Sequence, residues 1–223
     1  MKKKSMLLLL GALLTPLAGS ANDGFGGLSA TGLQFQQSAD VRMASEDLFL
    51  SPGQVRVTYV FRNQGPKETR GEIIFPLPPI SLGDLVESGF ALPEERLRSD
   101  NLVDFTAKVD GKRIEVRSER IAVLEPAYDQ PRKASVAYDA PGQDVTGLLR
   151  ELGVPLSLNV DQVRAALAGL PQTAKDRLKA RGLADFYEGE PPIPAWSIIV
   201  RYHWPQIFAP GRDTIIEHSY LPA

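Results

Sequence analysis

The sequence of 223 residues has no cysteine and only two histidines. The absence of cysteine excludes disulfide bonds, thiol nucleophiles and thiolate metal ligands. It also excludes an N-terminal lipoprotein anchor, which requires a cysteine at the cleavage site. Imidazole chemistry is limited to His203 and His218, near the end of the chain. The chain is therefore poor in the thiolate and imidazole side chains that zinc and other transition-metal sites use.

An excess of basic residues is also absent. Lysine and arginine number 25 against 27 aspartate and glutamate residues, for a net charge of −2. A protein that binds nucleic acid usually carries a basic excess, because it must neutralise phosphates. We therefore expect no nucleic-acid partner.

Long apolar runs are missing except near the N-terminus. The run from Met6 to Leu14 is too short for a membrane span, which needs about 20 apolar residues. Lys2 to Lys4 precede it and Gly19-Ser20-Ala21 follow it, which is the order of a secretory signal. We predict a signal peptide over 1–21, cleavage before Asn22 and a periplasmic or secreted protein. An uncleaved N-terminal anchor is the alternative. The mature chain has no transmembrane segment.

The mature chain begins with a β pattern. Apolar residues alternate with polar ones over 54–63, which predicts a strand with one buried side. Turn residues follow at 63–66, and we expect 68–75 to return as its partner. Residues 102–119 predict a second hairpin, because Asp110-Gly111 suits a two-residue type I′ turn. Strand pairing between 54–75 and 102–119 is the best-supported part of the β domain, while 80–98 is compatible with a short helix or a loop.

The pattern changes to helical spacing at 142–187. Three short helices are predicted, with Gly153 ending the first, Asn159 capping the second, Pro171 opening the third and Gly182 ending it. This segment is too small to hold a core of its own. We therefore divide the mature chain into a first β part over 22–141, a helical insertion over 142–187 and a returning β-hairpin over 188–223. The predicted fold is mainly β, an antiparallel β-sandwich with a small helical insertion.

The last β part is rich in large apolar side chains. Those of Trp196, Ile198, Val200, Tyr202 and Trp204 share one face of a predicted strand, which favours a core position over a ligand groove. The chain stops without a polar tail, so we expect the natural chain to continue beyond Ala223.

Five separated motifs occur in order along the chain. They are LSATGL at 28–33, SEDLF at 45–49, EIIFPLPP at 72–79, IAVLEP at 121–126 and RYHWP at 201–205. Together they resemble a family of bacterial exported proteins known as domain of unknown function 4424. The resemblance implies a location outside the cytoplasm and a chain that continues further, with no assigned activity. A more distant likeness to the vault and inter-alpha-trypsin type of β-sandwich concerns the fold alone.

The two histidines are the candidate metal ligands. If Pro210-Gly211 forms the centre of a two-residue turn, His203 and His218 oppose each other and could share a metal or a proton. A wider loop from Pro205 would instead separate them by about four residues. A metal site would also need a third ligand, and Glu217 points to the other face. The alternative is that both histidines have structural or solvent-facing roles.

Function remains open between three classes. Carboxylates at Glu46-Asp47, Glu94-Glu95 and 100–104 are scattered, and no serine elbow or phosphate loop is present. We expect no cofactor. The leading hypothesis is a non-enzymatic envelope module that binds another envelope protein through sheet edges or the insertion. The alternatives are an envelope hydrolase or metal-dependent enzyme and a carrier of a small apolar ligand.

Overall fold

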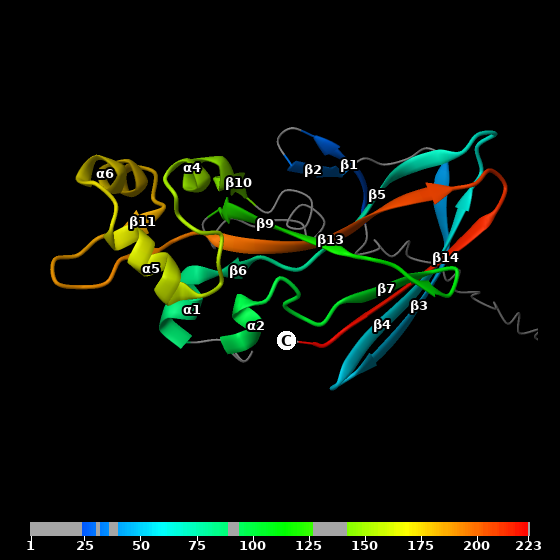
Figure 1. The fold of residues 1–223 in the computed structure, drawn as a ribbon, viewed down its shortest axis with the longest axis horizontal. Helices are drawn as coiled ribbons and strands as arrows, with labels where there is room; N and C mark the ends of the chain where they lie inside the picture. The colour runs from blue at the N-terminus through cyan, green and yellow to red at the C-terminus, as the bar shows by residue number, and fades with distance from the viewer. Residues whose placement is uncertain (1–23, 30–31, 36–39, 89–93, 127–141, 223) are drawn as a thin grey trace, which may run out of the picture.

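The computed structural model describes residues 24–29, 32–35, 40–88, 94–126 and 142–222. The predicted signal peptide lies outside these residues. The predicted mainly β fold with antiparallel sheets is confirmed, and Figure 1 shows its long strands with the helices gathered toward one end.

The described residues form two larger sheets and one small one. The first, which we call sheet A, has the order β10-β9-β13-β5-β1-β2, with β6 also paired to β13. Its strands are β10 (Gln143–Asp144), β9 (Arg117–Leu124), β13 (Ser197–Phe208), β5 (Thr69–Pro76), β1 (Gly24–Ser29), β2 (Gly32–Phe35) and β6 (Ile80–Ser81). The second, sheet B, has the order β3-β4-β14-β7-β8. Its strands are β3 (Val41–Ser51), β4 (Gln54–Asn63), β14 (Asp213–Tyr220), β7 (Thr106–Val109) and β8 (Lys112–Arg113).

The two C-terminal strands occupy central positions, one in each sheet. β13 lies between β9 and β5 in sheet A, and β14 lies between β4 and β7 in sheet B. In Figure 1, β13 runs along the molecule while β3, β4 and β14 cross its line at a steep angle. The predicted pairing between 54–75 and 102–119 is therefore wrong, because the C-terminal strands lie between those segments. β13 has the burial of a central strand, because the side chains on both of its faces are buried or half-buried from Ser197 to Trp204.

The predicted partnership of 54–63 with 68–75 is also wrong, since β4 and β5 belong to different sheets. The turn between them is a corner held by Asn63, which is fully buried. Its Nδ2 donates to the carbonyl oxygens of Lys67 and Phe208 at 2.8 and 2.9 Å, and its Oδ1 accepts from the Gly65 N–H at 2.9 Å. The Asn63 carbonyl accepts from the Gly211 N–H. Asn63 thus ties together two of the corners at which the chain crosses between the sheets, the one after β4 and the one after β13.

The hairpin at Asp110-Gly111 is confirmed. Lys108 pairs with Arg113 and Val109 with Lys112, which leaves a two-residue turn. Both turn residues have positive φ, +50° at Asp110 and +77° at Gly111. Two positive φ values define the type I′ turn, whose twist matches that of antiparallel strands. The return strand is shorter than predicted, because β8 ends at Arg113.

Helices form where the sequence predicted them. The ambiguous segment 80–98 contains α1 (Leu82–Ser88) and α2 (Glu94–Arg98). The insertion contains α4 (Thr146–Glu151), α5 (Val160–Ala168) and α6 (Gln172–Ala180). Asn159 caps α5 by accepting from the Gln162 N–H at 3.1 Å, and Gly153 and Gly182 follow α4 and α6 with positive φ. β11 (Ala184–Asp185) and β12 (Ile193–Pro194) then form a small sheet.

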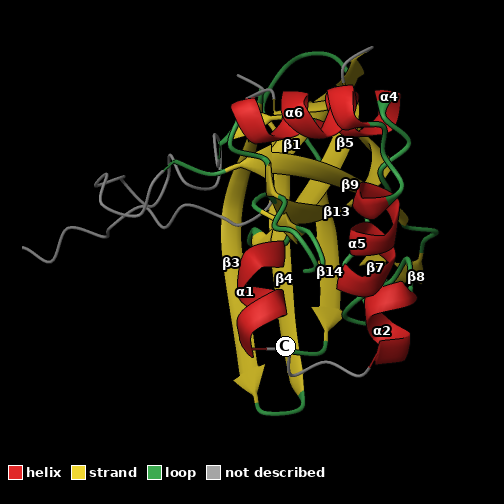
Figure 2. Ribbon diagram, turned by 90° about the vertical axis from the view of Figure 1, so that its left-hand side faces the viewer, coloured by secondary structure: helices red, strands yellow, loops and turns green. Residues whose placement is uncertain are grey.

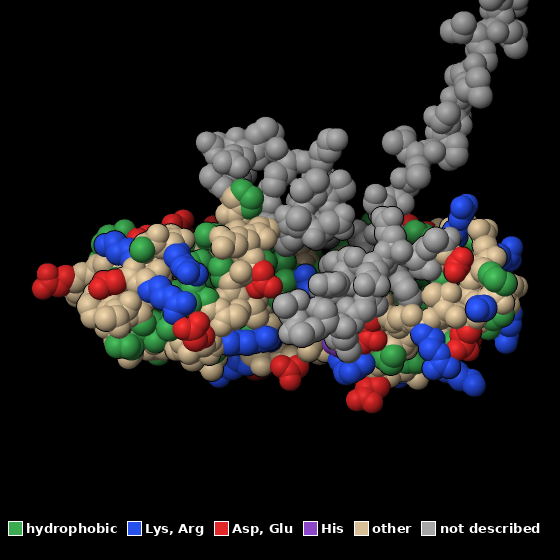
Figure 3. Space-filling view, turned by 90° about the horizontal axis from the view of Figure 1, so that it is seen from above, with side chains coloured by type: hydrophobic (Ala, Val, Ile, Leu, Met, Phe, Trp, Pro, Cys, Tyr) green, Lys and Arg blue, Asp and Glu red, His purple; other side chains and the backbone are tan. Residues whose placement is uncertain are grey.

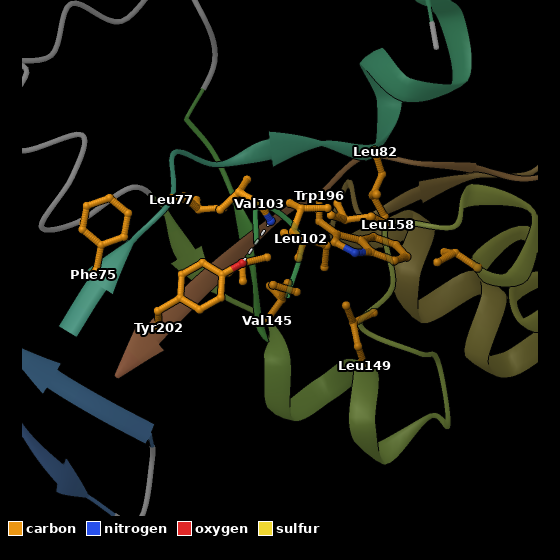
Figure 4. Packing of buried hydrophobic residues seen from close by; sticks show 14 of the residues in the cluster. Phe75, Leu77, Leu82, Leu102, Val103, Val145, Leu149, Leu158, Trp196 and Tyr202 are labelled. Atoms are coloured by element: carbon orange, nitrogen blue, oxygen red, sulfur yellow. Dashed lines mark hydrogen bonds between the residues drawn. The ribbon is translucent and has the colours of Figure 1, made fainter. Parts of the chain in front are cut away.

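The insertion and the sheets share one core. Buried side chains of α4, α5 and α6 belong to the same apolar cluster as those of β5 and β13. Figure 4 shows Leu149 of α4 and Leu158 of the following loop facing the region occupied by Trp196. The backbone joins them too, because β10 pairs with β9 and the Ala122 N–H donates to Thr146 Oγ1 at 2.9 Å. The helices therefore extend the core of the sheets.

Candidate functional site

His203 lies on the face of sheet A that points away from sheet B. Alternation along β13 places Tyr202 and Trp204 in the main core and His203 on the opposite face. There, His203 Nδ1 lies 2.9 Å from Oε1 of the buried Glu72, and Arg117 donates to the same oxygen at 3.0 Å. Because an ionised carboxylate only accepts, Nδ1 of His203 carries the hydrogen in this contact.

The arrangement around Glu72 explains its burial. A carboxylate removed from water is costly unless charged or polar hydrogen-bond donors surround it, and here an arginine and an imidazole do so. A glutamate–histidine pair can also serve proton transfer when a hydroxyl nucleophile is in reach. Among the described residues, His203 makes no hydrogen bond to a serine or threonine hydroxyl. Glu72, Arg117 and His203 therefore form one polar cluster across β5, β9 and β13.

His218 lies between the two sheets and is fully buried. Its ring lies 4.6 Å from that of Phe75, 5.2 Å from that of Phe105 and 5.6 Å from that of Tyr59, measured between centroids. The pairing of His203 opposite His218 is not formed, because β13 and β14 belong to different sheets. The physical reason is the corner at 209–212, which turns the chain from sheet A into sheet B. The two imidazoles thus lie on opposite sides of sheet A, with His218 between the two sheets and His203 on the other side.

The scattered carboxylates stay scattered. Glu46 and Asp47 lie on the exposed strand β3, and Asp104 forms an ion pair with Arg96 at 2.7 Å. In the described part of the chain, no group of three or more histidine and acidic side chains is arranged to hold a metal ion. Sequence spacing could not decide this point, because it carries no distances between loops.

The aromatic face of β13 forms part of the interior, as predicted. Trp196, Tyr202 and Trp204 are each at most 2% exposed. The Tyr202 ring stacks on Phe105 with centroids 4.5 Å apart, and its hydroxyl accepts from the Val103 N–H at 3.4 Å. Burial raises the pKa of Tyr202 above its ordinary value. These side chains hold the two sheets together.

The hairpin of β3 and β4 presents the clearest exposed apolar feature. Leu48, Phe49 and Leu50 are 54%, 43% and 65% exposed, and we call these three residues the apolar tip. Figure 2 shows the β3–β4 loop projecting beyond the helices. Phe49 lies on one face, where the Arg56 guanidinium stands 5.2 Å from its ring centroid. Leu48 and Leu50 lie on the other face, opposite Val57 and Val55 in register.

The second face of the apolar tip continues a buried cluster. Val55 and Val57 pack with Tyr59 in a small core of their own. β3 is the edge strand of sheet B, and among the described residues no strand pairs with its outer side. Its backbone N–H and C=O groups on that side face outward. Sequence analysis missed this feature, although three consecutive apolar residues before the turn at 51–54 were the visible signal.

Neither the helices of the described residues nor the charges on the face in view indicate a membrane span or a site for a polyanion. No helix among the described residues is long and apolar enough to cross a membrane. Figure 3 shows basic and acidic side chains interspersed over the described surface of one face.

Comparison with known proteins decides the family. The model of the family called domain of unknown function 4424 matches residues 21–223. The chain belongs to this family. The family match bears out the resemblance carried by the five motifs. No curated protein matches the chain significantly.

A solved structure is also similar to this member of the domain of unknown function 4424 family. It is a protein from Legionella pneumophila, described provisionally as a nutrient binding protein, with a TM-score of 0.39 and 16% sequence identity. The match covers 89% of this chain and 41% of that chain. This chain therefore spans less than half the length of that protein.

Proposed function

We propose that the protein is a non-enzymatic binding module of the cell envelope, which holds another protein through the open edge of sheet B. The envelope location is supported by the signal-like residues 1–21. The observation that carries the proposal is the apolar tip of β3, where three consecutive large apolar side chains stand exposed on an edge strand.

The apolar tip is unusual for an edge strand that stays uncovered. Natural proteins blunt such edges with charges, prolines or bulges, because an open row of N–H and C=O groups pairs readily with another chain. β3 has these devices along its first half, where a register irregularity lies between Met43 and Ser45 and the charged Glu46 and Asp47 follow. Leu48 to Leu50 have none of them. The distal half of β3 is thus the part open to a partner.

The chemistry of the edge defines the kind of partner. An extended segment of another protein can add to β3 as a further strand, with main-chain hydrogen bonds supplying affinity. Leu48 and Leu50 point to one face and Phe49 to the other, so a matching strand carries apolar residues on both faces at its end. Burial of Leu48 and Leu50 against the partner would also favour binding, because full burial of a leucine side chain contributes about 1.5–3 kcal/mol to the free energy of association. We infer a partner segment that is extended and apolar.

The experiment is site-specific photo-crosslinking in intact cells. A photoreactive phenylalanine analogue replaces either Phe49 of the apolar tip or Tyr187 of the insertion, which are both exposed aromatic residues. We expect an adduct with one envelope protein from position 49 and none from position 187. Mass spectrometry of that adduct should identify a partner segment with apolar residues on both faces of a strand.

Matched variants test the contact. Leu48→Ser with Leu50→Ser should abolish the adduct at position 49, whereas Ile207→Ser, which removes an exposed isoleucine from β13, should leave it intact. An adduct from position 187 alone would move the binding surface to the insertion. If neither position gives an adduct, protein binding by this module is refuted.

A further inference from the structure

A polar cleft lies near the insertion, and none of its lining residues belongs to the apolar tip. It has a volume of about 520 Å³ and opens where the end of α2, β9 and the segment before α5 meet. Two arginines line it, Arg98 of α2 and Arg120 of β9. The remaining lining residues are the apolar Pro155 and Leu156 and the uncharged polar Ser157, Asn159 and Gln162. No acidic side chain is among these lining residues.

Arg120 is a partly buried cation held by neutral groups. Its Nη2 donates to the Ser99 carbonyl oxygen at 2.5 Å, and its Nη1 donates to the Leu156 carbonyl oxygen at 3.5 Å. No carboxylate in the described part of the chain forms an ion pair with it. The two carbonyls fix the guanidinium in place but do not neutralise its charge. A partly buried charge without a counter-charge is costly, and a bound anion removes that cost.

The positive charge of the cleft comes from the arginines. The first turn of α5 is already capped, because Asn159 Oδ1 accepts from the Gln162 N–H. Arg98 is exposed and lies in the last turn of α2, which places a second guanidinium on the same cleft. A guanidinium presents a planar fork of N–H donors that matches the oxygens of a carboxylate or a phosphate. The chemistry of the cleft is therefore that of an oxyanion site with one apolar wall.

We propose that this cleft binds the carboxylate or phosphate group of a small organic anion, whose apolar part lies against Pro155 and Leu156. Two of the five N–H bonds of Arg120 are used by the carbonyls and the Nε–H is buried, which leaves one N–H bond on each Nη for the ligand. A few fixed polar groups beside an apolar wall are the usual composition of a small-molecule site. This site is separate from the edge strand β3, so either can exist without the other.

The test is isothermal titration calorimetry of the full mature chain with paired probes. Hexanoate and phenyl phosphate supply a carboxylate or a phosphate on an apolar body, and hexan-1-ol and phenol are their uncharged counterparts. We expect at least one of the two anions to bind and neither uncharged probe to do so. Hexanoate binding alone would assign the site to carboxylates, and phenyl phosphate binding alone would assign it to phosphates.

Variants locate the binding. Arg98→Gln should lower the affinity for the anion about ten-fold, which is the effect of losing one charged hydrogen bond. Arg120→Gln should abolish binding, and Arg150→Gln, a change on the exposed side of α4, should leave it unaltered. Because Arg120 also bridges two carbonyls, circular dichroism must show that the Arg120→Gln variant is folded. If that variant is unfolded, the affinity of Arg98→Gln for the anion alone tests the proposal. Absence of anion binding, equal binding of the uncharged probes, or unchanged binding by Arg98→Gln would overturn the proposal.

Discussion

Leu149→Ala tests whether the helical insertion and the β-sheets unfold as one unit. Leu149 is fully buried on α4. It belongs to the apolar cluster that includes Trp196, which precedes β13, and Trp204, which lies on β13. Replacing a buried leucine by alanine costs about 3 kcal/mol when the surroundings cannot collapse into the cavity. With a urea m-value of about 2 kcal/mol/M, the unfolding midpoint should fall by about 1.5 M.

The assay follows two signals during urea unfolding. Tryptophan fluorescence reports on the core around β13, because the chain has only two tryptophans, Trp196 just before β13 and Trp204 on it, and both are buried. Far-ultraviolet circular dichroism reports on the helices together with the sheets. We expect both signals to shift together in Leu149→Ala. The neighbouring Arg150→Ala, which changes an exposed side chain of the same helix, should change the free energy of unfolding by less than about 0.5 kcal/mol.

A divided response would refute the shared core. If the insertion were an independent unit, the variant would lose part of its circular dichroism in a separate, earlier transition. The tryptophan midpoint would then stay at its wild-type value. That outcome would mean that the contacts between α4 and sheet A contribute little to the free energy of unfolding.

Two further predictions concern a buried phenol and two glycines. Burial raises the pKa of Tyr202, so its contribution to stability is complete below pH of about 10 and is lost as the pH rises above that value. The free energy of unfolding of the wild type should therefore fall relative to that of Tyr202→Phe in alkaline urea titrations; a pH-independent difference would contradict this. Gly111→Ala should lower the free energy of unfolding by about 1 kcal/mol, because φ there is +77°. Gly147→Ala, inside α4 with open space around it, should raise it by about 0.5–1 kcal/mol, and equal effects at both glycines would refute the turn assignment.

Local features were predictable because neighbouring residues decide them. Asp110-Gly111 specified the type I′ turn, since few residues tolerate positive φ at two successive positions. Asn159, Gly153 and Gly182 marked helix ends for a similar reason, because caps act within one turn. The buried face of β13 was also evident in its alternating apolar residues.

Strand partners were not predictable in the same way. Alternation shows that a strand has a buried face but not which strand lies beside it. Asn63 looked like part of a hairpin turn, yet its buried amide bonds to Phe208, which lies 145 residues away along the chain. That contact converts the turn into a corner between two sheets. His203 and His218 were separated by the second corner, at 209–212.

The amino-acid sequence was enough to locate the β and helical segments, the turn at 110–111 and the apolar face of β13, and to indicate the family. These follow from periodicity, caps and motifs, all of which are local along the chain. Three features required the folded molecule: β13 and β14 occupy the centres of different sheets, Leu48 to Leu50 are exposed, and Arg98 and Arg120 line one cleft. The reason is physical: burial and charge pairing depend on which distant segments meet, and that is settled when the whole core packs.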